Sequence, residues 1–229
     1  MKVLSRRIFL KKISIVLLRL ETDRKISEPA SKLRGYIGNS FPDYPILHHH
    51  IKEGFYLYTY PRVQYKILEG VAIILGIEEG GEVVKRISNE IRRLNLGKNT
   101  YEVFSIKMTE KFSDFGFSKE EVKYRFVTPW LALNQSNYKH FKETRSWKVK
   151  KELLNGILIG NILSMSKGFD YVVRGRLHAR SLLDIESVDY KGVLHIGFTG
   201  DFTVNFVIPE YLGLGSGVSQ GFGTIVWRF

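Results

Sequence analysis

Apolar and polar residues follow one another along the first half of the chain in a pattern that predicts strands alternating with helices. Residues 13–20 are β-branched and apolar, which predicts a buried strand. Residues 79–96 place apolar side chains on one helical face opposite basic ones, which predicts an amphipathic helix. The expected elements are a strand at 13–20, a helix at 27–41, strands at 55–60, 63–68 and 71–77, a helix at 79–96 and a strand at 100–107. This order is that of a ferredoxin-like unit.

The second half repeats the mixture of strands and helices less regularly. A polar, turn-rich stretch at 111–121 separates it from the first half. The expected elements are a strand at 122–127, a helix at 147–166, strands at 171–181, 192–199 and 202–208, and a closing strand at 224–229. We therefore predict an α+β protein with tandem ferredoxin-like, RRM-like domains, whose antiparallel sheets carry helices on one face. The predicted domains are residues 1–115 and 116–229.

A glycine-rich segment precedes the last predicted strand. Five of the 21 glycines of the chain lie in it, at Gly213, Gly215, Gly217, Gly221 and Gly223. No residue between Tyr211 and Trp227 is charged. So many glycines allow backbone torsions that a side chain would forbid, and outward-pointing N–H groups can then hold a phosphate. On glycine content alone, a flexible or sharply turned connector is the other interpretation.

Composition and charge narrow the choice of partner. The chain has 229 residues, 44% of them hydrophobic, which is typical of a folded protein. Lys and Arg number 35 against 23 Asp and Glu, so the formal net charge is +12. Such an excess suits nucleic acid or an anionic membrane surface. No apolar run approaches the length of a membrane span, and no cysteine is present to form disulfides or thiolate metal sites, so we expect a cytoplasmic protein.

The first cluster of positive charge lies at 173–180. Arg174, Arg176, His178 and Arg180 alternate there with small or apolar residues. On a strand, this period of two makes one face basic and the other apolar. A solvated sheet face is the alternative, but the segment carries no acid, and we favour a stripe that contacts phosphates.

The second cluster lies at 139–151. Six basic residues, among them Lys148 and Lys150, accompany one acid, and the aromatic side chains of Phe141 and Trp147 stand between them. Cations interleaved with aromatic rings suit single-stranded nucleic acid, whose bases stack on such rings. A solvated loop and first helical turn explains the same pattern equally well. The charge pattern does not distinguish RNA from DNA.

Three consecutive histidines, 48–50, offer acid/base chemistry. On an extended chain, His48 and His50 share one face. Imidazoles exchange protons near neutral pH, and two of them suffice to cleave RNA through its own 2′-OH without a metal. A His-rich loop without chemistry and a metal site are the alternatives, although no metal-binding motif accompanies the run. Lys32, Arg34, Tyr56 and Tyr58 are candidates for supporting roles.

Several motifs together resemble one known family. The segments 47–50 and 58–66 resemble the amino-terminal half of the Cas6 CRISPR-associated repeat-processing endoribonucleases, in their archaeal b-type branch. The segments 128–134 and 156–164 resemble the carboxy-terminal half. The tail 209–215 with 221–223 resembles the glycine-rich signature of the wider RAMP superfamily. These motifs span nearly the whole chain in the expected order.

The resemblance implies metal-independent cleavage of CRISPR precursor RNA within each repeat, without a cofactor. Such enzymes leave a 2′,3′-cyclic phosphate and a 5′-hydroxyl. The resemblance places His48 and His50 at the catalytic position, with Tyr58 and Lys32 as helpers. The expected partner is CRISPR repeat RNA, and a CRISPR effector complex and a second copy of the chain are further candidates. A non-catalytic RAMP subunit that only holds CRISPR RNA, and a general single-strand nucleic-acid binding protein, are the alternative functions.

Overall fold

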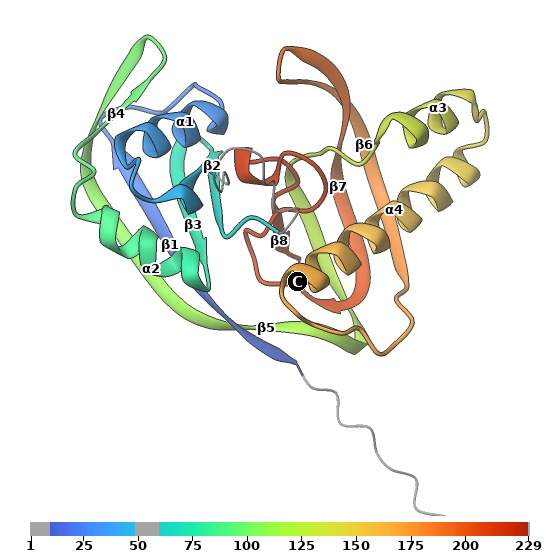
Figure 1. Cartoon of the computed structure of the whole chain (residues 1–229). Coiled ribbons are helices and arrows are strands. Elements are labelled where there is room, and N and C mark those ends of the chain that lie inside the picture. The colour runs from blue at the N-terminus through green and yellow to red at the C-terminus, as the bar shows by residue number, and fades with distance from the viewer. Residues whose placement is uncertain (1–9, 49–59, 229) are drawn as a thin grey trace, which may run out of the picture.

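One long strand, β5 (Asn99–Trp130), runs through both halves of the protein and joins their sheets (Figure 1). The structure is a computed structural model and describes residues 10–48 and 60–228. β5 pairs with β1 (Lys11–Thr22) up to Phe115 and with β7 (Val193–Val207) from Gly116 onward. The polar stretch 111–121, expected to be turn-rich, is therefore strand. Its local composition was misleading because partner strands on either side supply the backbone hydrogen bonds.

The N-terminal half is a ferredoxin-like unit, as predicted. Its further elements are α1 (Ala30–Ser40), the 3₁₀ turn η1 (Pro45–Leu47), β2 (Val63–Leu68), β3 (Val71–Ile77), α2 (Glu79–Ser88) and β4 (Arg93–Leu96). The antiparallel order β2-β3-β1-β5 is that of the ferredoxin fold. Both helices cover one face of this sheet, where Leu33 and Ile37 of α1 and Val84 of α2 join a core with Leu18 of β1.

The helix predicted over 79–96 is wrong over its last eight residues. α2 ends at Ser88, and residues 93–96 form β4, which pairs with β5 in the register Leu94 to Tyr101. Leu94 and Leu96 are buried at a period of two, whereas the residues between and before them face solvent. Gly97, with φ of +68°, makes the hairpin turn into β5 and does not cap a helix. Hairpin pairing therefore overrides the helical pattern here.

The C-terminal half has the same strand order, but a glycine-rich segment stands in the place of its second helix. Its elements are α3 (Gln135–Glu143), α4 (Trp147–Gly168), β6 (Ala179–Tyr190), β7, the 3₁₀ turn η2 (Val218–Gln220) and β8 (Ile225–Trp227). β6-β7-β5-β8 is again the ferredoxin order, with α4 as the first crossover helix. The glycine-rich segment, with its short turn η2, occupies the place of the second helix. Among the described residues, no helix is long and apolar enough to cross a membrane.

Two strands of this half differ from the prediction. Residues 171–178, expected to be strand, lie outside any strand, and β6 instead continues to Tyr190. The strands expected at 192–199 and 202–208 are one strand, β7, with Gly200 at φ of +119° between them. The acidic residues within β6 are tolerated because its outer side is exposed, and β7 supplies a continuous ladder from Ala179 to Tyr190.

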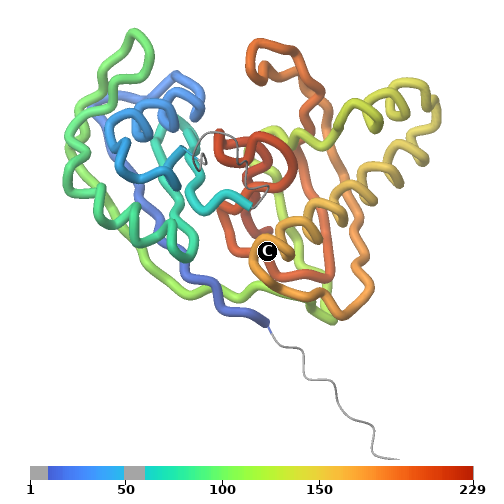
Figure 2. The backbone as a smooth tube through the Cα atoms, in the orientation of Figure 1, coloured from blue at the N-terminus to red at the C-terminus, as the bar shows by residue number. Residues whose placement is uncertain are grey.

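The two halves share a core. Ile15 and Leu75 on the helix-free face of the N-terminal sheet join one buried cluster with Phe206 and with Leu158 of α4. The interface between the halves, called the joint below, also contains polar contacts. The guanidinium of Arg62 donates to the carbonyl of Gly168 at 2.8 Å and stacks over the Phe169 ring. The halves are therefore packed against one another as one body, with the glycine-rich segment between them (Figure 2).

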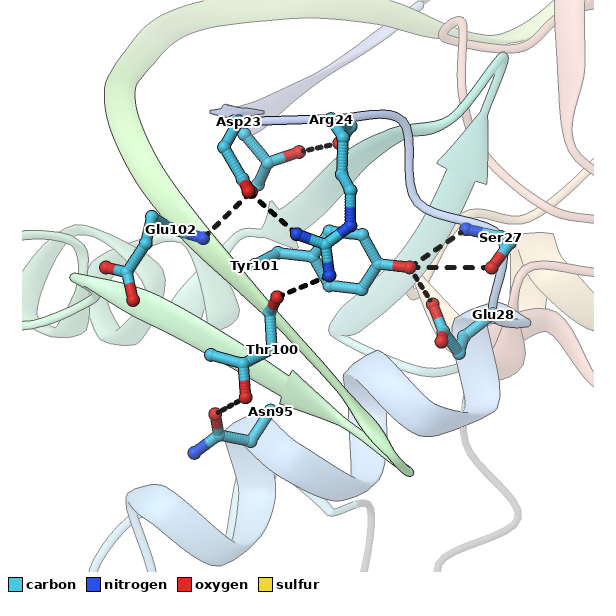
Figure 3. Close-up of polar contacts among 9 residues, drawn as sticks. Asp23, Arg24, Ser27, Glu28, Asn95, Thr100, Tyr101 and Glu102 are labelled. Atoms are coloured by element: carbon cyan, nitrogen blue, oxygen red, sulfur yellow. Dashed lines mark hydrogen bonds and ion pairs between the residues drawn. The ribbon is translucent and has the colours of Figure 1, made fainter.

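The start of α1 is fixed by a polar network at the β4–β5 hairpin (Figure 3). The hydroxyl of Tyr101 donates to the Glu28 carboxylate at 2.6 Å, just before the helix begins. Arg24 lies over the Tyr101 ring and donates to the carbonyl of Thr100 at 2.8 Å. The network ties the β1–α1 connection to β5, so α1 has a defined position from which its side chains reach the joint between the halves.

Candidate active site

The glycine-rich segment is packed into the joint between the halves. The backbone N–H of Gly213 donates to the side-chain oxygen of Gln64 at 3.1 Å, and its carbonyl accepts from the Tyr60 hydroxyl at 2.8 Å. A Cβ atom on Gly221 would lie 2.9 Å from the Cβ of Ala30 and 3.0 Å from the carbonyl oxygen of Tyr65. The segment therefore packs tightly against α1 and β2, which excludes the interpretation as a flexible connector.

Most of its backbone donors are used inside the protein. The N–H groups of Gly221 and Gly223 donate to the carbonyls of Val218 and Pro129, and that of Gly213 donates to the Gln64 side chain. Among contacts of described residues, the N–H groups of Gly215 and Gly217 have no such bond. Of the five glycines predicted to hold a phosphate, Gly215 and Gly217 are therefore the ones whose N–H groups remain candidates for that role.

His48 sits at the edge of this joint, at the end of η1. Its N–H closes the 3₁₀ turn by donating to Pro45 at 3.0 Å. The imidazole lies against Gly38 of α1, where a Cβ atom would overlap the ring. One turn earlier on the same helix, Arg34 donates to the carbonyl of His48. Helix α1 thus holds both the ring and the backbone of His48.

Arg34 is the cation that accompanies His48. Desolvation lowers the pKa of its half-buried guanidinium, and the nearby hydroxyls of Tyr65 and Tyr190 partly offset this effect. Burial also raises the pKa of Tyr65, whose hydroxyl donates to the carbonyl of Leu47 at 3.2 Å. Arg34 is therefore a weakly hydrated charge, and such a charge interacts more strongly with a phosphate than a fully solvated one does.

Lys32 lies elsewhere on α1. Two residues along a helix correspond to a rotation of about 200°, so Lys32 and Arg34 point to opposite sides. Lys32 is exposed to solvent, whereas Arg34 faces His48. The helper role expected for Lys32 stays a prediction, with Arg34 in the better position. The other catalytic candidates, His50 and Tyr58, and the third histidine, His49, lie outside the described residues.

The basic segment 174–180 is extended and mostly exposed, and only its last two residues belong to a strand. Arg174, Arg176 and Arg180 face solvent, and Arg180 alone of these lies in β6. The side chain of Asn205, only 7% exposed, replaces the missing ladder. It accepts from the N–H of His178 at 2.7 Å and donates to the carbonyl of Arg176 at 3.0 Å. The basic side chains therefore still alternate with less exposed residues, as expected. The side chain of Asn205, and not pairing with a neighbouring strand, supports this extended segment.

The second basic cluster lies at the start of α4. Lys150 stands over the rings of Phe141 and Trp147, at 4.7 Å and 5.2 Å, and the Trp147 side chain is 61% exposed. Lys148 is exposed beside it. In Figure 1 this end of α4, with α3, lies at the edge of the C-terminal half farthest from α1. The structure thus does not bring Lys148 and Lys150 to the joint that holds His48.

A buried lysine beside the glycine-rich segment was not predicted from the sequence. Lys66 of β2 is 0% exposed, and its ammonium group donates to the same Gln64 oxygen that accepts from Gly213, at 3.1 Å. Burial lowers the pKa of Lys66 to about 7. Because side chains alternate along β2, Gln64 and Lys66 lie on the other face of the strand from the core residues Val63 and Tyr65. A face that carries a glutamine and a lysine is typical of a solvent-exposed surface. No sequence pattern predicted the burial of Lys66, because the glycine-rich segment that covers it lies far away in the chain.

No group of His, Asp and Glu side chains suited to hold a metal ion occurs among residues 10–48 and 60–228. Around His48, the described residues offer its imidazole, the desolvated guanidinium of Arg34 and the nearby hydroxyls of Tyr65 and Tyr190. These groups can move protons and stabilise a negatively charged phosphate.

Comparison with known proteins identifies relatives across both halves. Residues 11–114 match the family described as the Cas6b N-terminal domain, and residues 116–227 match the Cas6b C-terminal domain. A crystal structure of Cas6b is 32% identical, with a TM-score of 0.86, over 95% of this chain and 100% of that one. A crystal structure of the CRISPR RNA processing endoribonuclease Cas6b is 31% identical, with a TM-score of 0.76, over 94% of this chain and 100% of that one.

A curated relative is also similar. It is an uncharacterized protein of Methanocaldococcus jannaschii, 48% identical over 148 residues, which are 64% of this chain and 97% of the relative.

Proposed function

This chain belongs to the Cas6b family, and we propose that it is an endoribonuclease that cleaves CRISPR precursor RNA within each repeat to give mature crRNA. The match to the family across both halves supports the substrate, since a relative of the same fold is described as a CRISPR RNA processing endoribonuclease. The observation that carries the proposal is the position of His48, which α1 holds beside Arg34 at the joint between the halves.

The proposed reaction is internal transfer. The 2′-OH next to the scissile phosphate loses its proton to a general base and attacks phosphorus, and a general acid protonates the departing 5′-oxygen. The products are a 2′,3′-cyclic phosphate and a 5′-hydroxyl. The nucleophile is already adjacent to its target, so positioning supplies much of the acceleration and no metal ion is required.

The residues take the following roles in this proposal. His48 and His50 share the acid and base roles, with Tyr58 as a helper. Arg34 stabilises the negative charge that develops on the phosphate, because its guanidinium is desolvated and lies next to His48. Lys32 remains a second candidate for that role.

The two basic clusters predicted from the sequence bind the RNA on either side of the cut. The exposed arginines Arg174, Arg176 and Arg180 contact phosphates, and Lys148 and Lys150, with the Trp147 ring, hold a more distant part of the repeat. The N–H groups of Gly215 and Gly217 donate to phosphates of the RNA backbone near the joint. Transfer of the product to an effector complex and pairing with a second copy are further expectations of the same proposal.

Incubating the protein with end-labelled repeat RNA in EDTA tests the function. We expect one cut within the repeat, and mass spectrometry should find a 2′,3′-cyclic phosphate on the upstream product. A repeat with a 2′-deoxy sugar at the cut should bind and stay intact. Cleavage of the deoxy RNA would rule out internal transfer, whereas binding without any cleavage would identify a non-catalytic RNA-holding subunit.

A further inference from the structure

Three aromatic side chains from separate parts of the chain meet where the β6–β7 hairpin passes the glycine-rich segment. Tyr190 ends β6, His195 lies near the start of β7 and Phe222 belongs to the glycine-rich segment. The Tyr190 ring lies 5.6 Å from the His195 ring and 5.4 Å from the Phe222 ring, edge to face in both cases. All three residues are half-buried, unlike the fully buried aromatic rings of the core. The cluster is therefore ordered and still reachable from solvent.

The surrounding backbone is shaped to seat the Tyr190 ring. Lys191 and Gly192, with φ of +56° and +77°, form the two-residue turn between β6 and β7. This turn places the Lys191 ammonium group over the Tyr190 ring at 5.3 Å. A Cβ atom on Gly217 would lie 3.1 Å from Tyr190 and 2.8 Å from Phe222, so glycine is required where the glycine-rich segment passes the rings.

The cluster adjoins the proposed cleavage site. The glycine-rich segment links the cluster to α1, because Gly217 packs against Tyr190 and Gly221 packs against Ala30 at the start of the helix. Arg34 of the same helix contacts His48, and its pKa is also influenced by Tyr190. Tyr190 and His48 thus both lie near Arg34, at the same joint. Cations close to partly exposed aromatic rings are an arrangement that suits an RNA base and its phosphate.

We propose that Tyr190, with His195 and Phe222, forms a stacking platform that holds one unpaired RNA base next to the scissile phosphate. This inference rests on the proposed function, because it assigns the platform to the same RNA. Stacking fixes the nucleotide at the cut, and Arg34 then meets the phosphate of that nucleotide. Tyr190 is a positioning residue in this scheme, since it does not touch the reacting atoms.

Fluorescence of 2-aminopurine tests the platform directly. Repeat RNAs that carry a 2′-deoxy sugar at the cut and 2-aminopurine at one position near it are bound to the protein one at a time. We expect quenching at a single position within about one nucleotide of the cut, because stacking on an aromatic ring quenches this base. The Tyr190→Phe variant should keep the quenching, and Tyr190→Ala should lose it and bind RNA about tenfold more weakly.

Controls separate the platform from the proposed function. Phe104→Ala removes an exposed aromatic ring (71% exposed) from β5, away from the joint, and should change neither quenching nor affinity. If Tyr190→Ala does not fold, His195→Ala should reduce the quenching instead. RNA that binds and is cut normally but shows no quenched position, or quenching that survives Tyr190→Ala, would overturn the platform alone. Failure to bind repeat RNA at all would overturn both proposals.

Discussion

At the scale of single residues, the position of His48 depends on an absent side chain. Gly38 leaves the space that the imidazole occupies, and Arg34 one turn away holds the backbone carbonyl. The sequence predicted the importance of His48 because it belongs to a run of histidines. Its seat on α1 was not predictable, since no local pattern reveals that a glycine of the preceding helix faces the ring. Only the folded connection through η1 brings the two residues together.

Replacing Gly38 tests this seat. In Gly38→Ala, the new methyl group overlaps the imidazole and displaces it, so single-turnover cleavage should fall by about 10- to 100-fold. RNA affinity should change by less than about twofold, since the phosphate contacts remain. Gly35→Ala is the matched control, because that glycine is exposed on the same helix with nothing near it. Equal cleavage by the two variants would show that His48 needs no such seat.

The basic segment 174–180 also acts through individual residues. Arg174→Ala combined with Arg176→Ala should weaken RNA binding and lower the slope of log affinity against log salt by about 1.4, or about 0.7 for each lost phosphate contact. Filter binding across a salt series measures this slope. Arg86→Ala with Arg92→Ala removes the same charge from the N-terminal half and should leave the slope almost unchanged. An unaltered slope in the first double variant would remove the segment from the RNA-binding surface.

At the scale of elements, the glycine-rich segment replaces a helix of the second ferredoxin-like unit. Its glycines serve compactness, because backbone or ring atoms occupy the space that their side chains would need. The sequence predicted the location of this segment and the strand after it. It did not predict the tight packing on α1 and β2, because the residues that the segment covers lie in the other half of the chain.

The cost of filling that space is measurable. Gly223 has φ of +62°, and a Cβ atom there would overlap the carbonyl of Leu214. Gly223→Ala should therefore lower the free energy of unfolding in urea by more than the roughly 1–2 kcal/mol that a left-handed backbone costs alone. Gly192→Ala has a similar φ of +77° in open space and should show only that smaller cost. Identical losses in both variants would mean that the segment is loosely packed.

At the scale of the whole molecule, the strand order of both halves followed from the sequence, and their junction did not. Periodicity located β1, α1, β2, β3 and α4, since each has a strong local pattern. It failed at residues 111–121, where a polar stretch is held as strand by pairing with β1 and β7. The burial of Lys66 was also not predicted, because it depends on how the halves meet at the joint.

Buried Lys66 makes the stability of the joined halves depend on pH. Its pKa is about 7 in the folded protein, against an ordinary value of 10.5, so the unfolded chain binds more protons between these values. The free energy of unfolding should therefore rise with pH between about 7 and 10, by an amount on the order of a few kcal/mol. Urea unfolding at several pH values measures this rise.

Lys66→Met should remove most of the rise and be more stable than the parent at pH 7. Lys119→Met, at an exposed position of β5, should keep the rise and serves as the control. A parent protein whose stability does not change over this range would mean that the ammonium group is not buried in solution.

The most direct test of the central claim compares cleavage with binding when both candidate imidazoles are removed. Single-turnover cleavage of repeat RNA in EDTA and the Kd for a 2′-deoxy repeat are measured for the parent and for His48→Ala with His50→Ala. Loss of the general acid and base should slow cleavage by about 100-fold or more, with the Kd changed by less than about threefold. Cleavage that is unaffected, or that falls only in proportion to binding, would contradict the assignment of these histidines as the acid/base groups.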